Sequence, residues 1–82
     1  MEVPVLEFVK MVPTNFAHYQ KYQVFKMMHN DTKFILGYIY EDKIGFNFRP
    51  EKDVIFSFPH LQEITQFMEE LERVTLYERI AD

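Results

Sequence analysis

The chain contains no cysteine and no tryptophan, and it has few residues that interrupt regular structure: two glycines and four prolines among 82 residues. Without cysteine no disulfide can form, and small secreted domains commonly depend on disulfides, so a reducing compartment is favoured. No apolar run approaches the ~20 residues that cross a membrane, and the start, Met1 to Pro4, lacks the basic segment of a signal peptide. We therefore expect a cytoplasmic protein (in the host cytoplasm if the source is viral) with no membrane partner.

Residues that usually carry chemistry are also sparse. The only serine, Ser57, has no nucleophile motif around it. Gly37 and Gly45 each stand alone within apolar segments, which excludes a phosphate-binding loop and indicates a bulge or close packing. No zinc-ligand spacing connects the three histidines, which are His18, His29 and His60.

Two pairs of adjacent carboxylates occur, Glu41-Asp42 in a predicted turn and Glu69-Glu70 on the surface of a predicted helix. Acid–base catalysis needs carboxyl groups in a cleft that perturbs them, and the pattern gives neither pair such a cleft. We therefore predict that the protein is not an enzyme. It should have no catalytic residue, no metal ligand and no cofactor.

The composition predicts one folded domain, residues 1–82, because 48% of the residues are hydrophobic and 27% are charged. The net charge of −4 is unevenly spread: residues 1–56 carry seven basic and seven acidic residues, whereas residues 57–82 carry two and six. This balance disfavours a nucleic-acid partner, because phosphate binding needs an excess of Lys and Arg.

The order of patterns predicts an α+β fold, in which an antiparallel meander of four to five strands is followed by one amphipathic helix packed on one face. Runs rich in β-branched and aromatic residues predict strands at 3–12, 21–29, 33–41, 44–49 and 54–58. Turn chemistry separates them at 30–32, 42–43 and 50–53, and residues 13–20 form either a loop or one helical turn.

A helix is predicted at 59–74, with Ser57 as its cap and Pro59 in its first turn. Apolar residues recur there at helical spacing and make one stripe: Leu61, Ile64, Phe67, Met68, Leu71 and Val74. Past Val74 the stripe blurs, and the pattern leaves open whether residues 75–82 continue the helix.

Hairpin geometry assigns the strand residues to two faces, if Asp42-Lys43 is a two-residue turn and the turn near Asp31 has an even length. The face expected to pack against the helix carries Tyr22, Val24, Met28, Ile35, Ile39, Ile44, Phe46 and Phe48, with Lys26 as its only charge. The other face carries Gln23, Phe25, Met27, Leu36, Tyr38, Tyr40, Asn47 and Arg49. This second face is less polar than a plain solvent face.

Two readings of the second face remain open at this stage. In one, the strand at 3–12 folds over it with Leu6 and Phe8 and makes a second core layer. In the other the face is an interface, because Tyr, Met and Arg are enriched in interface cores. The second reading predicts the partner-binding residues Phe25, Tyr38, Tyr40, Asn47 and Arg49.

The leading functional hypothesis is a non-enzymatic protein-interaction module, an inhibitor or adaptor that occludes a partner protein. In size and acidity the chain resembles phage-encoded inhibitors of host machinery. A second, apolar sheet face on so small a domain also predicts a two-fold homodimer, since a small core gives little stability to spare.

The alternative is binding of single-stranded nucleic acid. Over residues 21–74 the order of a four-stranded antiparallel sheet and a helix resembles the Whirly and PC4 families of single-stranded-DNA-binding proteins. That resemblance implies that Phe25, Tyr38 and Tyr40 stack on bases, with Lys21, Lys33 and Arg49 near the backbone.

Overall fold

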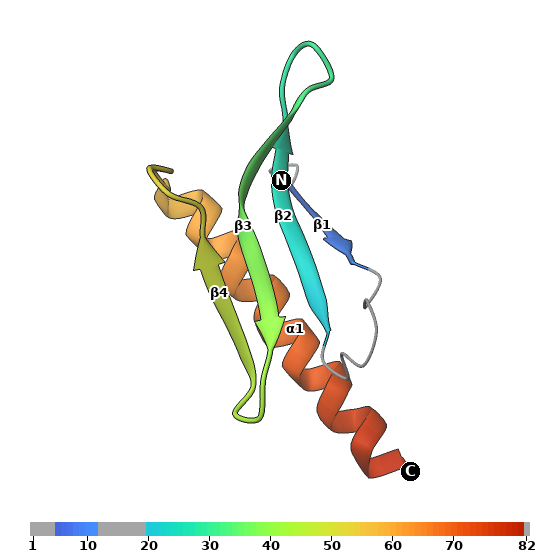
Figure 1. The fold of residues 1–82 in the computed structure, drawn as a ribbon. Helices are drawn as coiled ribbons and strands as arrows, with labels where there is room; N and C mark the ends of the chain where they lie inside the picture. Colours follow the sequence, from blue (N-terminus) through green and yellow to red (C-terminus); the bar gives the residue numbers. More distant parts are fainter. Residues whose placement is uncertain (1–4, 12–19, 82) are drawn as a thin grey trace.

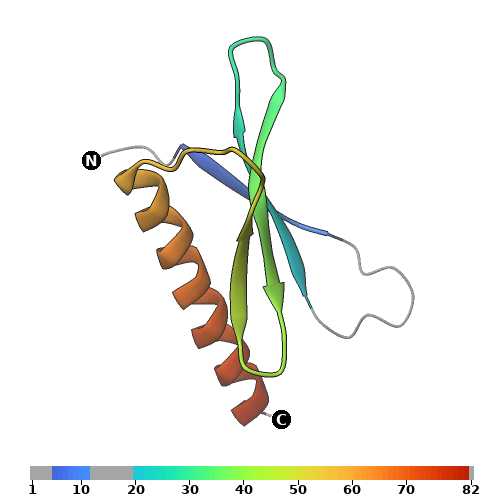
Figure 2. The ribbon, with the colours of Figure 1, turned by 60° about the vertical axis from the view of Figure 1, so that its left-hand side comes forward.

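The fold, described for residues 5–11 and 20–81 by a computed structural model, is a sheet covered on one face by a helix. The strands β1 (Leu6–Lys10), β2 (Lys21–Met27), β3 (Lys33–Glu41) and β4 (Phe46–Pro50) pair antiparallel in chain order. The helix α1 (Phe58–Ala81) lies across one face of this sheet (Figures 1 and 2). The predicted α+β meander with a C-terminal helix is therefore confirmed, with four strands.

The predicted strand at 54–58 is wrong. Residues 54–57 pair with no described strand and form the connection that crosses from β4 to the start of α1 (Figure 2). Its side chains nevertheless alternate, because Val54 and Phe56 pack against the core while Ile55 is 92% exposed. Residues 12–19, which include most of the ambiguous segment, lie outside the described residues, as do residues 3 and 4.

The start of α1 follows the sequence prediction closely. The Ser57 hydroxyl accepts a hydrogen bond from the His60 backbone N–H at 3.4 Å, and the Ser57 carbonyl accepts one from the Leu61 N–H at 3.1 Å. Ser57 is thus the N-cap. The helix runs on to Ala81, because neither glycine nor proline follows Pro59 to end it.

The core lies between the sheet and the middle of α1. Its buried side chains are Leu6, Val24, Leu36, Ile39, Phe46 and Ile64. The Phe8 ring stacks on the Phe67 ring with centroids 4.1 Å apart and planes 12° from parallel, which joins β1 to the helix. Leu61 and Val74, the ends of the predicted stripe, are 44% and 41% exposed. The part of the predicted stripe that is buried is therefore its middle, at Ile64, with Phe67, Met68 and Leu71 partly buried against the core.

The β2–β3 hairpin contains an odd-length turn and a β-bulge that offset each other. At the turn, the Met28 N–H bonds the Thr32 carbonyl at 2.9 Å, and Asp31 has the left-handed φ of 61° that aspartate tolerates. The register shifts between Val24 and Phe25, which face Gly37 and Ile35, so one residue of β3 has no partner.

Because of the bulge, the predicted assignment of residues to the two sheet faces is wrong near the hairpin tip. Leu36, assigned to the second face, lies in the core at 2% exposure, whereas Ile35, assigned to the core face, pairs with Phe25. Met28, also assigned to the core face, is 42% exposed. From Val24 back to Lys21, the one-residue offset of the odd turn is cancelled by the extra residue of the bulge. The predicted assignment of residues to faces is therefore correct in that part of the hairpin.

We expect Ile64→Ala to lower the free energy of unfolding by about 2–5 kcal/mol, because the side chain is only 4% exposed and its removal leaves a cavity. Val74→Ala on the same helix is the control and should cost less than about 0.5 kcal/mol. Urea denaturation of both variants measures this. Equal losses would show that the helix does not pack on the sheet through Ile64.

Candidate binding surface

The face of the sheet away from α1 carries two tyrosines flanked by cations. Strand pairing arranges them in two rows, Lys21–Tyr40–Asn47 and Gln23–Tyr38–Arg49, each running across β2, β3 and β4. Directly paired residues point to the same side of a sheet, and so do residues two apart on one strand. We call this set the aromatic–cationic patch: Lys21, Tyr38, Tyr40, Asn47 and Arg49.

The predicted register between β3 and β4 is wrong by two residues. A two-residue turn would place Tyr38 opposite Asn47, but the structure pairs Tyr38 with Arg49 and Tyr40 with Asn47. The last pair is Glu41 with Phe46, so the connection has four residues rather than two. A shift of two leaves every side chain on its original face. The predicted grouping of Tyr38, Tyr40, Asn47 and Arg49 on one face is therefore the grouping found.

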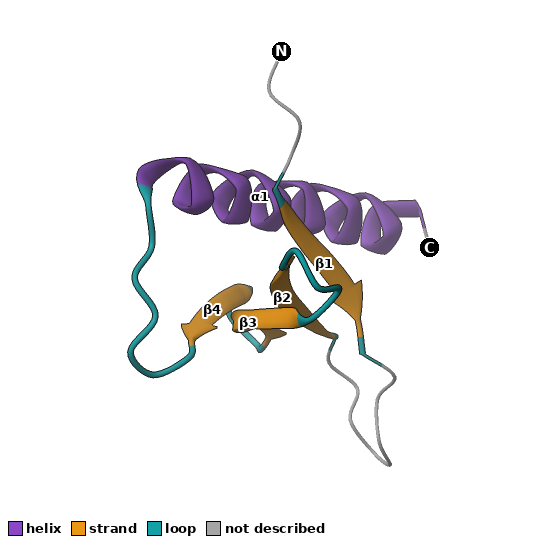
Figure 3. Ribbon diagram, turned by 90° about the horizontal axis from the view of Figure 1, so that it is seen from above, coloured by secondary structure: helices purple, strands orange, loops and turns teal. Residues whose placement is uncertain are grey.

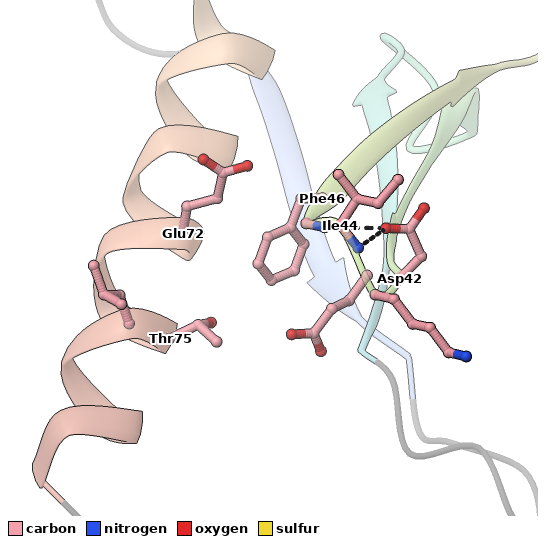
Figure 4. A pocket seen from close by; sticks show the side chains of 9 residues that line it. Asp42, Ile44, Phe46, Glu72 and Thr75 are labelled. Atoms are coloured by element: carbon pink, nitrogen blue, oxygen red, sulfur yellow. Dashed lines mark hydrogen bonds between the residues drawn. The ribbon is translucent and has the colours of Figure 1, made fainter.

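Asp42 determines the longer turn. Its carboxylate accepts hydrogen bonds from the backbone N–H groups of Ile44 at 2.8 Å and Gly45 at 3.0 Å (Figure 4), and its own N–H donates to the Gly45 carbonyl at 2.8 Å. Gly45 has a φ of 152°, which favours glycine. Ile44, assigned to the core, is 96% exposed in this loop. The Asn47 side-chain amide also donates to Asp42, which ties the turn to the patch.

The cations of the patch lie over its aromatic rings. The Lys21 ammonium is 4.7 Å from the Tyr38 ring centroid and 5.1 Å from the Tyr40 centroid, and the Arg49 guanidinium carbon is 5.6 Å from the Tyr40 centroid. These distances are typical of cation–π contacts. From the sequence, Lys21 is expected near this face only in the nucleic-acid alternative, and the structure pairs it with Tyr40.

Strand β1 does not cover the patch. It pairs with β2 at the edge of the sheet, and it begins beside α1 (Figure 3), where the Val5 and Leu6 N–H groups each donate to Glu63 at 3.0 Å. Leu6 and Phe8 face the helix rather than the patch. For residues 6–10, the reading in which the N-terminal strand forms a second core layer over this face is therefore wrong.

Phe25 differs from the other predicted contact residues. It is 3% exposed, and the Lys33 ammonium lies 4.6 Å from its ring centroid. It therefore offers a partner little contact area and serves as a support under the same face. Tyr38 and Tyr40 are half-buried, while Asn47 and Arg49 are exposed.

Charge is segregated between the two layers. The strand pairings place the cations Lys21, Lys33 and Arg49 on the patch side, and Glu7 is the acid that the pairings place there. The exposed acids of α1 lie in the other layer and are Glu69, Glu70 and Glu72, with Arg73 paired to Glu70. The outer face of the sheet is thus locally cationic, although the net charge of the chain is −4.

We searched the described side chains, those of residues 5–11 and 20–76, for other kinds of site. No group of three or more His, Asp or Glu there lies close enough to hold a metal ion. A pocket of about 230 Å³ separates the β3–β4 loop from α1, where Glu72 and Thr75 face Phe46 (Figure 4). Its lining includes Lys43, Thr75 and the carboxyl groups of Glu41, Asp42 and Glu72, but no histidine, serine or cysteine.

No helix in the described part of the chain is both long enough and apolar enough to span a membrane. Comparison with family models, with curated protein sequences and with solved structures finds no match to this chain. The resemblance to the Whirly and PC4 families therefore rests on the order of elements alone.

The Asp42 turn gives the fold a dependence on pH. The backbone N–H of Ile44 is the main cause that lowers the pKa of the Asp42 carboxyl, and the Gly45 N–H and the Asn47 amide lower it further. A carboxyl whose folded pKa is depressed stabilises the fold above its unfolded pKa, and that contribution is lost as the pH falls through the folded pKa.

We expect Asp42→Asn to be less stable than the parent at neutral pH, because the amide oxygen is a weaker acceptor than the carboxylate for the same N–H groups. The difference should shrink as the pH falls below about 4, because the Asp42 carboxyl becomes protonated first in the unfolded chain and, at lower pH, in the folded chain. Urea denaturation at several pH values measures the gap. A gap that stays constant down to about pH 2 would show that the Asp42 charge does not stabilise the turn.

Proposed function

We propose that the protein is a non-enzymatic protein-interaction module, a small inhibitor or adaptor that occludes a partner protein. The observation that supports this best is the aromatic–cationic patch, in which Tyr38 and Tyr40 lie under Lys21 and Arg49 on a sheet face that β1 leaves uncovered. Tyrosine and arginine dominate binding hot spots because each gives a large contact area and a polar tip.

The patch also has the rigidity that favours binding. Each contact side chain stands on a paired strand, and the Tyr38 and Tyr40 rings lie 6.4 Å apart, held by the cations above them. A preorganised surface loses less side-chain entropy when a partner docks. A hollow of about 660 Å³ lies next to the patch and gives room for a partner side chain; its lining residues are Tyr40, Glu41, Asp42, Asn47, Phe48 and Arg49.

We expect the double variant Tyr38→Ala, Arg49→Ala to fold but to lose partner capture from the native host, by about 2 kcal/mol or more for each hot-spot residue. The matched control, Glu69→Ala with Arg73→Ala, changes exposed residues of α1 and should capture the partner as the parent does. Affinity capture with thermal melting of all three proteins measures both properties. Normal capture by the patch variant, or melting far below the parent, would show that the patch is structural.

We also propose that the chain forms a two-fold dimer, through the apolar side chains around the beginning of α1 rather than through the patch. These side chains are Val5, Ile55, Phe58 and Leu61, and they are 47%, 92%, 70% and 44% exposed. A symmetric contact through the patch would bring Lys21 and Arg49 against their own copies, and like charges oppose such a contact.

Sedimentation at micromolar concentration tests the dimer. We expect Phe58→Ser to give a monomer, because it removes the largest of these exposed side chains. Ile44→Ser, at the β3–β4 loop near the other end of the sheet (Figure 1), is the matched exposed control and should remain dimeric. A parent protein that sediments as a 10.0 kDa monomer, with stability unchanged on dilution, would contradict the dimer.

Single-stranded nucleic acid is the second candidate partner. It is favoured by the alternation of cations and tyrosines on one sheet face, which is the arrangement that base stacking uses. It is opposed by the net charge of −4 and by the position of Lys21 over both tyrosine rings.

A further inference from the structure

We infer that the partner segment bound by the aromatic–cationic patch is acidic, with carboxylates that bind Lys21 and Arg49 from the solvent side. This inference rests on the proposed function and specifies the chemistry of the partner. It follows from three properties of the patch, which are its unpaired cations, the covered faces of its rings and its charge relative to the rest of the chain.

The cations of the patch have aromatic rings beneath them and no described carboxylate within ion-pair distance. Glu41 lines the same hollow as Arg49 but accepts a hydrogen bond from the Gln20 N–H at 3.2 Å. Among the side chains that the structure describes, those of residues 5–11 and 20–76, the ion pair is that of Arg73 with Glu70 on α1, so neither Lys21 nor Arg49 has an acidic partner there. Asp42, the nearest acid on the β3–β4 turn, is engaged by two backbone N–H groups and by Asn47. The positive charge of the patch is therefore available to a ligand.

The covered rings distinguish an acidic peptide from a nucleobase. A base that stacked on Tyr38 or Tyr40 would have to displace the Lys21 ammonium, which lies 4.7 Å and 5.1 Å from the two centroids. A carboxylate needs no such displacement, because it binds the ammonium from the solvent side while the ring remains below. Charge-assisted hydrogen bonds of this kind are stronger than neutral ones.

The number of cations on the patch side also favours a short acidic peptide over a strand of nucleic acid. The patch side holds three cations, Lys21, Lys33 and Arg49, and one acid, Glu7, in a chain whose net charge is −4. A single strand of nucleic acid carries one phosphate per nucleotide, so the remaining phosphates would meet an acidic protein. A short peptide with two or three carboxylates matches the patch without that repulsion.

The test measures the affinity of a fluorescein-labelled peptide of about ten residues that alternates glutamate and leucine, at low salt because the attraction is screened within about 10 Å at 0.1 M. The charge-removing variant is Lys21→Gln with Arg49→Gln, which keeps the aliphatic stems over the rings. Its matched control is Lys21→Arg with Arg49→Lys, which keeps both charges. A lysine–leucine peptide and oligo-thymidine of the same length are the comparison ligands.

We expect the glutamate peptide to bind the parent and the charge-keeping variant, and to bind the charge-removing variant about tenfold or more weakly. Equal binding to both variants, tighter binding of the lysine peptide, or tighter binding of oligo-thymidine would overturn the inference. The same proteins are used for partner capture. If Tyr38→Ala with Arg49→Ala loses the captured partner while the glutamate peptide fails to bind the parent, the acidic partner is wrong and the interaction module stands.

Discussion

One extra residue in β3 decides which side of the sheet the tyrosines occupy. The turn at the tip of the β2–β3 hairpin pairs Phe25 with Ile35, and this register, continued along the strands, would place Tyr38 opposite Tyr22 on the core side. The bulge between Val24 and Phe25 shifts the pairing, so that Tyr38 faces Gln23 and Ile39 faces Tyr22. The same irregularity therefore brings Ile39 into the core and frees Tyr38 for the outer face.

Gly37 allows this arrangement to pack. A Cβ at this position would lie 2.4 Å from the Arg49 carbonyl oxygen and 2.9 Å from the Phe48 ring. Since a real Cβ cannot approach so closely, β4 lies this near to β3 only with glycine there. With β4 packed this closely against Gly37, Arg49 lies directly opposite Tyr38. The positions of the patch residues are thus determined by the pairing of the strands.

The segregation of charge makes the two layers chemically different surfaces. Acids on α1 keep the chain negative overall, and cations over tyrosines make the outer sheet face locally positive. Opposite fields on the two layers would orient an approaching charged partner toward one of them. The local charge of neither surface can be deduced from the net charge of the chain.

The sequence predicts local features well and long-range register less well. It places β3 at Lys33–Glu41 and the cap of α1 at Ser57, because propensity and capping act over a few residues. It misses the four-residue turn, since two backbone hydrogen bonds to Asp42 decide that turn. From the sequence, Ile35 and Leu36 are also each assigned to the wrong face of the sheet, because a bulge cannot be recognised in a run of apolar residues.

The grouping of four predicted contact residues on one face was correct for a related reason. An error of two residues in the β3–β4 register does not change the face, so Tyr38, Tyr40, Asn47 and Arg49 were grouped correctly in spite of the wrong turn. Phe25 was grouped with them, but its burial depends on how tightly the surrounding strands pack, and the alternation of residues does not report that.

The most direct test of the patch as the binding surface is nuclear magnetic resonance of the labelled chain during titration with the acidic peptide. The amide signals of Lys21, Tyr38, Tyr40 and Arg49 should shift together, and those of Glu69 to Arg73 on α1 should stay in place. Shifts confined to α1 or to the tip of the β2–β3 hairpin, with the patch signals unmoved, would contradict the assignment of this face as the binding surface.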